Sequence, residues 1–298
     1  MALTADFSLG VITRANATAE RRFLRRCRGF IAMLLVATLA SCRWMTASLP
    51  ANARAFQPPA VYARWWALTE ACSGRSGDMG TVRWYRVASP EFQVDGQQAT
   101  AYWGRRDNRI VLADDLMENG TAVRHEMLHA LLRERGHPRA QFLGACASVL
   151  DCPGSCITDG GAWRLPQLDY LVLPPDSLDV YSEARLLPRE ADGERWVSLL
   201  VAVRNRRALA IVVAAPGDRV TPATFSYELR GAEGGLSGSD IATDSSQLYL
   251  LPYETKSRLF EFRVASDLTP FHVPPGSHLL RGGYAGLWSA YDTVDVTR

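Results

Sequence analysis

Two histidines and a glutamate within five residues are the first indication of chemistry in this sequence. His125, Glu126 and His129 lie in the segment AVRHEMLHALL, and the 298-residue chain has only five histidines. On an α-helix, residues four apart lie on one face about one turn apart, so both imidazoles can hold the same metal ion. Glu126 would then serve as general base toward a water molecule. The spacing therefore predicts a hydrolytic metal centre, with zinc as the typical ion.

The elements around this motif must bring its side chains to one site. Apolar periodicity predicts a helix over residues 121–135, with Thr121 as N-cap and Gly136 in the stop position. Pro138 suits the first turn of a following helix that runs to about residue 150. Alternation and turn residues predict a small sheet, and apolar spacing predicts one more helix. The strands are expected at 81–88, 98–104 and 109–113, and the helix at 61–71.

In this context the motif resembles the active-site helix of the zincin metallopeptidases. The resemblance is specific over residues 109–137 and general over 61–172. It implies that His125 and His129 are zinc ligands and that Glu126 is the general base. It also implies that an edge strand above the helix aligns a peptide or protein substrate.

The third zinc ligand does not follow from the motif. The metzincins place a histidine six residues after the second ligand, where this chain has Arg135, and the gluzincins place a glutamate where it has Gly144. We favour His137, because it follows Gly136 at the point where the chain turns back. Asp159, in a segment faintly similar to the aspzincin ligand, and an acidic residue elsewhere remain alternatives.

The N-terminal segment reads as an export signal. Residues 21–42 (RRFLRRCRGFIAMLLVATLASC) combine a basic start with an apolar run of about 12 residues, too short for a membrane-spanning helix. Leu39-Ala40-Ser41-Cys42 resembles the lipobox of bacterial lipoproteins, which implies cleavage before Cys42 and its acylation. We therefore expect a signal peptide over 1–41 and a tether over 42–60. The protein would be lipid-anchored in the cell envelope, outside the cytoplasm, on the outer membrane if the cell has two.

Export changes the interpretation of the six cysteines. Cys27 would be lost with the leader and Cys42 acylated, which leaves four thiols in an oxidising compartment. Three pairings are possible, and we favour Cys72 with Cys146 and Cys152 with Cys156, because the latter two flank a Pro-Gly-Ser turn. A metal site built from these thiols is the competing interpretation, but their spacing does not match the usual zinc knuckles.

Charge and composition argue against a nucleic-acid partner. The chain carries 33 basic and 31 acidic side chains, a net charge of +2. Six arginines and two acids precede Cys42, so the leader holds +4 and the remainder −2. The part of the chain expected to be mature is therefore not basic.

The residue pattern of the sequence changes after Pro174 and Pro175. Short apolar or alternating segments follow one another, separated by Gly, Pro, Asp and Ser. We therefore predict an α+β zincin-like domain over 61–173, followed by an all-β immunoglobulin-like sandwich over 174–298. The strands are expected at 195–204, 209–215, 224–230, 247–253, 258–265, 277–284 and 288–296.

Two functions are compatible with these features. The first is a lipid-anchored zinc metallopeptidase that hydrolyses peptide bonds, with Zn²⁺ as cofactor. The second is a non-catalytic surface lipoprotein whose sandwich binds a partner or an envelope component. The missing standard third ligand keeps the second alternative open.

Overall fold

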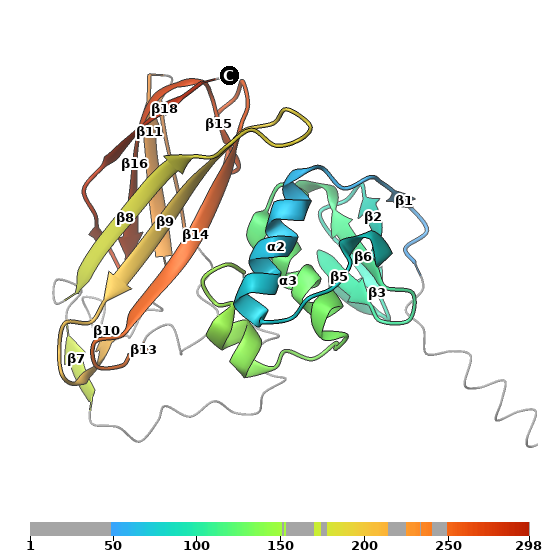
Figure 1. The fold of residues 1–298 in the computed structure, drawn as a ribbon, viewed down its shortest axis with the longest axis horizontal. Helices are drawn as coiled ribbons and strands as arrows, with labels where there is room; N and C mark the ends of the chain where they lie inside the picture. Colours follow the sequence, from blue (N-terminus) through green and yellow to red (C-terminus); the bar gives the residue numbers. More distant parts are fainter. Residues whose placement is uncertain are drawn as a thin grey trace, which may run out of the picture. The chain divides into compact units, whose positions relative to one another are not determined.

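The computed structural model describes residues 49–150, 152, 170–173, 178–213, 225–232, 234–239 and 249–297 (Figure 1). The described residues all belong to one compact unit, Leu49–Arg298. The predicted signal peptide over 1–41 and the acylated Cys42 lie outside the described residues. Within the described ranges, no helix is both long and apolar enough to cross a membrane.

A mixed four-stranded sheet forms the N-terminal part of the fold. Its order is β1-β2-β6-β5, with β2 and β6 parallel and the other pairs antiparallel. The central strand β6 buries four of its five residues, which explains why its sequence is almost wholly apolar. A separate hairpin, β3-β4, precedes β5. The strands are β1 (Ala53–Ala55), β2 (Arg83–Val87), β3 (Phe92–Val94), β4 (Gln97–Ala99), β5 (Ala101–Gly104) and β6 (Arg109–Ala113).

The segment expected to be a tether belongs in part to this sheet. β1 pairs with β2 from Ala53 onward, although its residues are half-buried or exposed. Backbone hydrogen bonds rather than side-chain burial hold such an edge strand. The sequence of β1 therefore has no apolar alternation from which the strand could be predicted. Any tether must therefore end before residue 53.

Two helices pack together against the N-terminal sheet. α2 (Val61–Ser73) buries Trp65, and α3 (Gly120–Leu132) carries the histidine motif. A Cβ at Gly120 would lie 3.0 Å from the Trp65 ring, so glycine permits the close approach of the helices. Residues 123–130 of α3 are all buried, so this helix is enclosed on every side, polar residues included.

The ends of α3 differ from the prediction. Asn119, not Thr121, is the N-cap, and its side chain accepts a hydrogen bond from the Ala122 amide at 3.2 Å. The helix stops at Leu132 because Arg133 takes a left-handed conformation with φ of 56°. Gly136 therefore lies beyond the helix end, in the loop that leads to His137.

The helix expected from Pro138 to residue 150 is much shorter. Only η3 (Ala140–Ala145) forms there, as a π-helix of six residues. Gly144 disfavours a longer helix, and the bond from Cys146 to Cys72 fixes the chain just beyond it. Two 3₁₀ turns complete the helical elements of the described residues: η1 (Met79–Thr81) and η2 (Asp114–Leu116).

Two sheets packed face to face, here called the C-terminal sheets, make up most of the rest. One has the order β15-β14-β9-β8, and the other β12-β11-β16-β17 with β18 beside β16. Their inner faces share one hydrophobic core, and a Cβ at Gly282 would lie 2.4 Å from Val201, which shows how closely the sheets approach. The strands are β8 (Asp179–Leu186), β9 (Trp196–Arg204), β14 (Thr255–Val264), β15 (His272–Val273), β11 (Phe225–Gly231), β12 (Gly234–Ser239), β16 (Gly276–Tyr284), β17 (Leu287–Trp288) and β18 (Asp292–Val296).

A third, smaller sheet has the order β13-β10-β7. Its strands β7 and β10 are parallel, and β13 is antiparallel to β10. Its members are β7 (Tyr170–Leu173), β10 (Ala210–Val213) and β13 (Tyr249–Leu250).

The predicted fold class, an α+β zincin-like domain followed by an immunoglobulin-like sandwich, is wrong. The described part of the chain is mostly β, with 43% of its residues in strands spread over several sheets and 20% in helices. The histidine motif determines one helix and says nothing of its surroundings. The helix predicted from Pro138 to residue 150 is largely absent, and strands such as β1 and β8 were missed because their half-exposed residues lack a strong apolar signal.

Candidate metal centre

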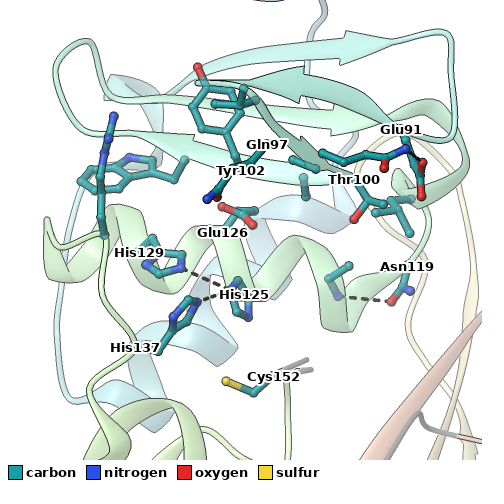
Figure 2. A pocket seen from close by; sticks show the side chains of 18 of the residues that line it. Glu91, Gln97, Thr100, Tyr102, Asn119, His125, Glu126, His129, His137 and Cys152 are labelled. Atoms are coloured by element: carbon teal, nitrogen blue, oxygen red, sulfur yellow. Dashed lines mark hydrogen bonds between the residues drawn. The ribbon is translucent and has the colours of Figure 1, made fainter. Parts of the chain in front are cut away.

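Three histidines from one helix and the loop after it meet at a single point (Figure 2). His125 and His129 are one turn apart on α3, and His137 reaches back from the loop. The Nε2 atom of His125 lies 3.2 Å from the Nε2 atoms of both His129 and His137. One ring nitrogen from each residue falls within 4.8 Å of the other two. The structure thus brings together all three residues predicted as ligands.

A backbone contact fixes which nitrogen of His129 faces the cluster. Its Nδ1 atom lies 2.8 Å from the carbonyl oxygen of Glu134, and because a carbonyl only accepts, Nδ1 must donate. Nε2 therefore carries a free lone pair toward the other rings. Burial and the two neighbouring histidines lower the pKa of His129 well below its usual value, so the ring is neutral as a metal ligand requires.

Aromatic side chains hold the three rings from two sides. Phe142 of η3 is buried, and its ring centroid lies 5.0, 4.8 and 4.9 Å from those of His125, His129 and His137. Trp103 of β5 is parallel to His129 within 6°, at 6.4 Å. These apolar neighbours restrict the imidazole rotamers and exclude water from behind them.

Glu126 is buried beside the histidines. Its residue is 5% exposed, and its Oε2 atom has no hydrogen-bond partner among the described residues. Burial raises the pKa of its carboxyl group to about 8. A buried carboxyl oxygen without a partner is costly, and such groups are found where a ligand or reacting group completes the contact.

A cavity of about 710 Å³ opens over this cluster. Edge strand β5 and the β3-β4 hairpin form one wall, and α3 forms another (Figure 2). The size is that of ordinary small-molecule or peptide-side-chain sites. Its lining includes Glu91, Asp95, Gln97, Gln98, Thr100, Tyr102, Trp103, Asn119, His125, Glu126, His129, Arg135 and His137.

The donor set fits a zinc ion. Three imidazole nitrogens with one open side are the ligand set of catalytic rather than structural zinc sites, which use four protein ligands. Among the described residues, no acidic side chain or cysteine joins the cluster. The unpartnered carboxyl oxygen of Glu126 adds a base in the same cavity.

The predicted disulfide between Cys72 and Cys146 is confirmed. It joins the last turn of α2 to the end of η3, close to Phe142. Cys152 is also disulfide-bonded, and its predicted partner Cys156 lies outside the described residues. The interpretation of Cys72 and Cys146 as metal ligands is therefore excluded.

The other positions considered for the third ligand do not approach the histidines as ligands. Arg135 forms a half-exposed ion pair with Asp95, 3.9 Å away, and Gly144 lies within η3. Asp159 lies outside the described residues. Sequence reasoning missed Phe142 and Trp103, because an aromatic residue in an apolar segment gives no sign of which side chains it will contact.

Comparisons with known proteins give no assignment. No protein-family model matches the chain, and no curated protein matches it. An X-ray structure of a Northeast Structural Genomics Consortium target is 11% identical, with a TM-score of 0.25 over 42% of this chain and 89% of that one. The DNA-bound alkylpurine DNA glycosylase AlkC of Pseudomonas fluorescens is 11% identical, with a TM-score of 0.27 over 41% of this chain and 31% of that one.

A third structure, of a Bordetella pertussis protein given the name ApaA, is 16% identical, with a TM-score of 0.23 over 43% of this chain and 93% of that one. At these scores the likenesses carry no argument about fold or function. Any functional conclusion must therefore come from the site itself.

Proposed function

We propose that the protein is a zinc-dependent hydrolase of peptide bonds. The observation that carries the proposal is the meeting of three imidazole nitrogens within 4.8 Å, in an open cavity, beside a buried glutamate whose Oε2 atom has no hydrogen-bond partner among the described residues. We further propose that it acts outside the cytoplasm, anchored through lipid on Cys42, as the leader sequence suggests.

His125, His129 and His137 would hold the zinc ion through their ring nitrogens. When bound, zinc supplies Lewis-acid polarisation of a carbonyl group and lowers the pKa of a water nucleophile toward neutrality. The hydrogen bond from His129 Nδ1 to the Glu134 carbonyl would keep the ring in its liganding tautomer and orientation.

Glu126 would move the proton. Its carboxylate would take a proton from the attacking water and return it to the amine that leaves when the peptide bond breaks. Burial raises the pKa of this carboxyl group to about 8, so near neutral pH it would need the positive charge of a bound zinc ion to stay deprotonated and act as the base.

The cavity wall supplies a place for an extended substrate. β5 is the terminal strand of its sheet, and its residues line the cavity together with Ala99 and Thr100. An extended peptide could add to such an edge by backbone hydrogen bonds, with side-chain selectivity supplied by the cavity lining. A peptide or protein is therefore the substrate class that the site suits.

The test uses residues 43–298, with zinc per chain measured alongside hydrolysis of a mixed-peptide library. We expect one zinc per chain and cleavage that falls at least about 1000-fold in Glu126→Gln, which keeps the shape but removes the base. Glu134→Gln is the matched control, because its exposed side chain undergoes the same chemical change while its carbonyl still accepts from His129.

A folded wild-type protein without zinc would contradict the proposal. Zinc binding without hydrolysis, in wild type and both variants alike, would instead favour the non-catalytic surface lipoprotein. Equal losses in Glu126→Gln and Glu134→Gln would show that Glu126 has no special role.

A further inference from the structure

A buried ion pair joins the metal-binding helix to the C-terminal sheets. Arg124, the residue immediately before His125, is 1% exposed and donates from Nη1 to Glu261 Oε2. Glu261 lies on β14, 137 residues later in the chain, and is itself 8% exposed. Its other oxygen accepts from Arg64 of α2.

Arg124 has little freedom apart from this partner. Its Nε atom donates to the carbonyl oxygen of Val149, and its guanidinium lies 5.7 Å from the centroid of the Trp65 ring. A Cβ at Gly120 would lie 2.8 Å from its Nη1 atom, so the helix start is shaped around this side chain. Arg124 is thus fixed, and its charge depends on Glu261 for neutralisation.

The same strand also holds the segment that follows Phe142. Arg258 of β14 donates to the carbonyl oxygens of Ala147, at 3.1 Å, and Leu150. The Leu259 amide donates to the Ser148 carbonyl at 3.0 Å. β14 therefore contacts α3, which carries two of the proposed ligands. It also contacts the segment that follows Phe142, whose ring packs against the three imidazoles.

We propose that Glu261 is a positioning residue of the histidine site, which it controls by neutralising and orienting Arg124. This inference rests on the proposed metal site. Burial alone would raise the pKa of Glu261, but Arg124 and Arg64 outweigh burial and hold it below its usual range, so the carboxylate is charged. Without that charge, a buried arginine one residue before His125 would lack its counter-charge.

An unpaired buried cation has two consequences for the site. Arg124 would lose its counter-charge, and α3 would lose the contact that holds it against β14. The positive charge would also oppose a second cation held by the adjacent histidine. Both effects weaken metal binding without removing any ligand.

The experiment compares Glu261→Gln with the double variant Arg124→Met/Glu261→Gln in residues 43–298. Zinc affinity is measured by chelator competition, and site geometry by the visible absorption of the cobalt(II)-substituted protein. We expect Glu261→Gln to bind zinc at least about tenfold more weakly and to change the cobalt spectrum. The double variant, which lacks the unpaired cation, should return within about threefold of wild type and regain its spectrum.

Glu190→Gln is the matched control. Glu190 accepts from Arg64 at 2.6 Å, as Glu261 also does, but it does not touch Arg124. Its loss should leave zinc affinity and the cobalt spectrum unchanged.

The outcomes separate this inference from the proposed function. If the wild type binds zinc and Glu261→Gln has the same zinc affinity and cobalt spectrum, the positioning role is overturned and the proposed metal site is not. Zinc binding without hydrolysis overturns the peptidase proposal and leaves this test intact, because no readout depends on turnover. If Glu261→Gln does not fold, the double variant decides: recovery of fold and metal supports the inference, and failure of both variants overturns it.

Discussion

At the scale of single residues, the histidine site depends on His137 more than on the recognisable motif. His125 and His129 are placed by helix geometry alone, four residues apart. His137 comes from a loop and is brought in because α3 stops at Leu132 and Arg133 turns the chain. Its Nε2 atom then lies as close to His125 as that of His129 does.

We therefore predict that His137→Ala lowers zinc affinity more than about 100-fold, because loss of a ligand should cost more than loss of a residue that only orients a ligand. Affinity is measured by chelator competition, with folding checked by circular dichroism. His278→Ala is the control, since His278 is a buried histidine of β16 whose Nε2 bonds the Pro274 carbonyl instead of the cluster. Unchanged zinc occupancy in His137→Ala would remove it from the site and return attention to Asp159.

At the scale of elements, the short π-helix η3 supports one side of the histidine site. It carries Phe142 against all three imidazoles, and the Cys72–Cys146 disulfide ties its end to α2. π-helical turns are rare and recur at functional sites, where one extra residue re-aims a side chain. The disulfide thus supports the site through the position of Phe142.

Removal of this bridge by Cys72→Ser/Cys146→Ser should cost about 4 kcal/mol of unfolding free energy, because the bond closes a separation of 74 residues. It should also weaken zinc binding, since Phe142 loses its support. Guanidinium unfolding and chelator competition measure the two effects. Cys152→Ser/Cys156→Ser is the comparison, and it should cost about 2 kcal/mol, because its predicted loop is short. Equal losses from the two pairs would contradict this account.

The elements also show what the sequence could and could not predict. β6 and the core of α3 were predicted nearly residue for residue, because a strand buried on both faces and a helix with apolar residues three and four apart leave strong patterns. The hairpin β3-β4 was missed although Asp95 and Gly96, both with positive φ, form the typical two-residue turn. That signal was present in the sequence.

Other features had no local signal. Glu261 lies on a strand whose pattern looks ordinary, and its partner Arg124 is 137 residues earlier. Charged residues are rarely buried, so a sequence pattern assigns both to the surface. Only the tertiary structure, which brings β14 against α3, shows that these charges belong beside the metal site.

At the scale of the whole molecule, the N-terminal part does not complete its own core. Trp196 of β9 packs edge-on against Trp65 of α2, with ring centroids 5.4 Å apart, and both are fully buried. Arg64 and Arg124 likewise find their carboxylates beyond residue 173, at Glu190 and Glu261. The histidine site therefore belongs to a unit that includes the C-terminal sheets.

We predict that residues 49–173 alone neither fold nor bind zinc, whereas residues 49–298 do both. Loss of Glu261 alone leaves a buried arginine unpaired, at a cost of about 3–5 kcal/mol, which approaches the whole stability of a small domain. Circular dichroism, tryptophan emission and zinc stoichiometry compare the two chains, and residues 174–298 added in trans should restore the fragment. A fragment that folds and binds zinc unaided would show instead that the C-terminal sheets are dispensable to the site.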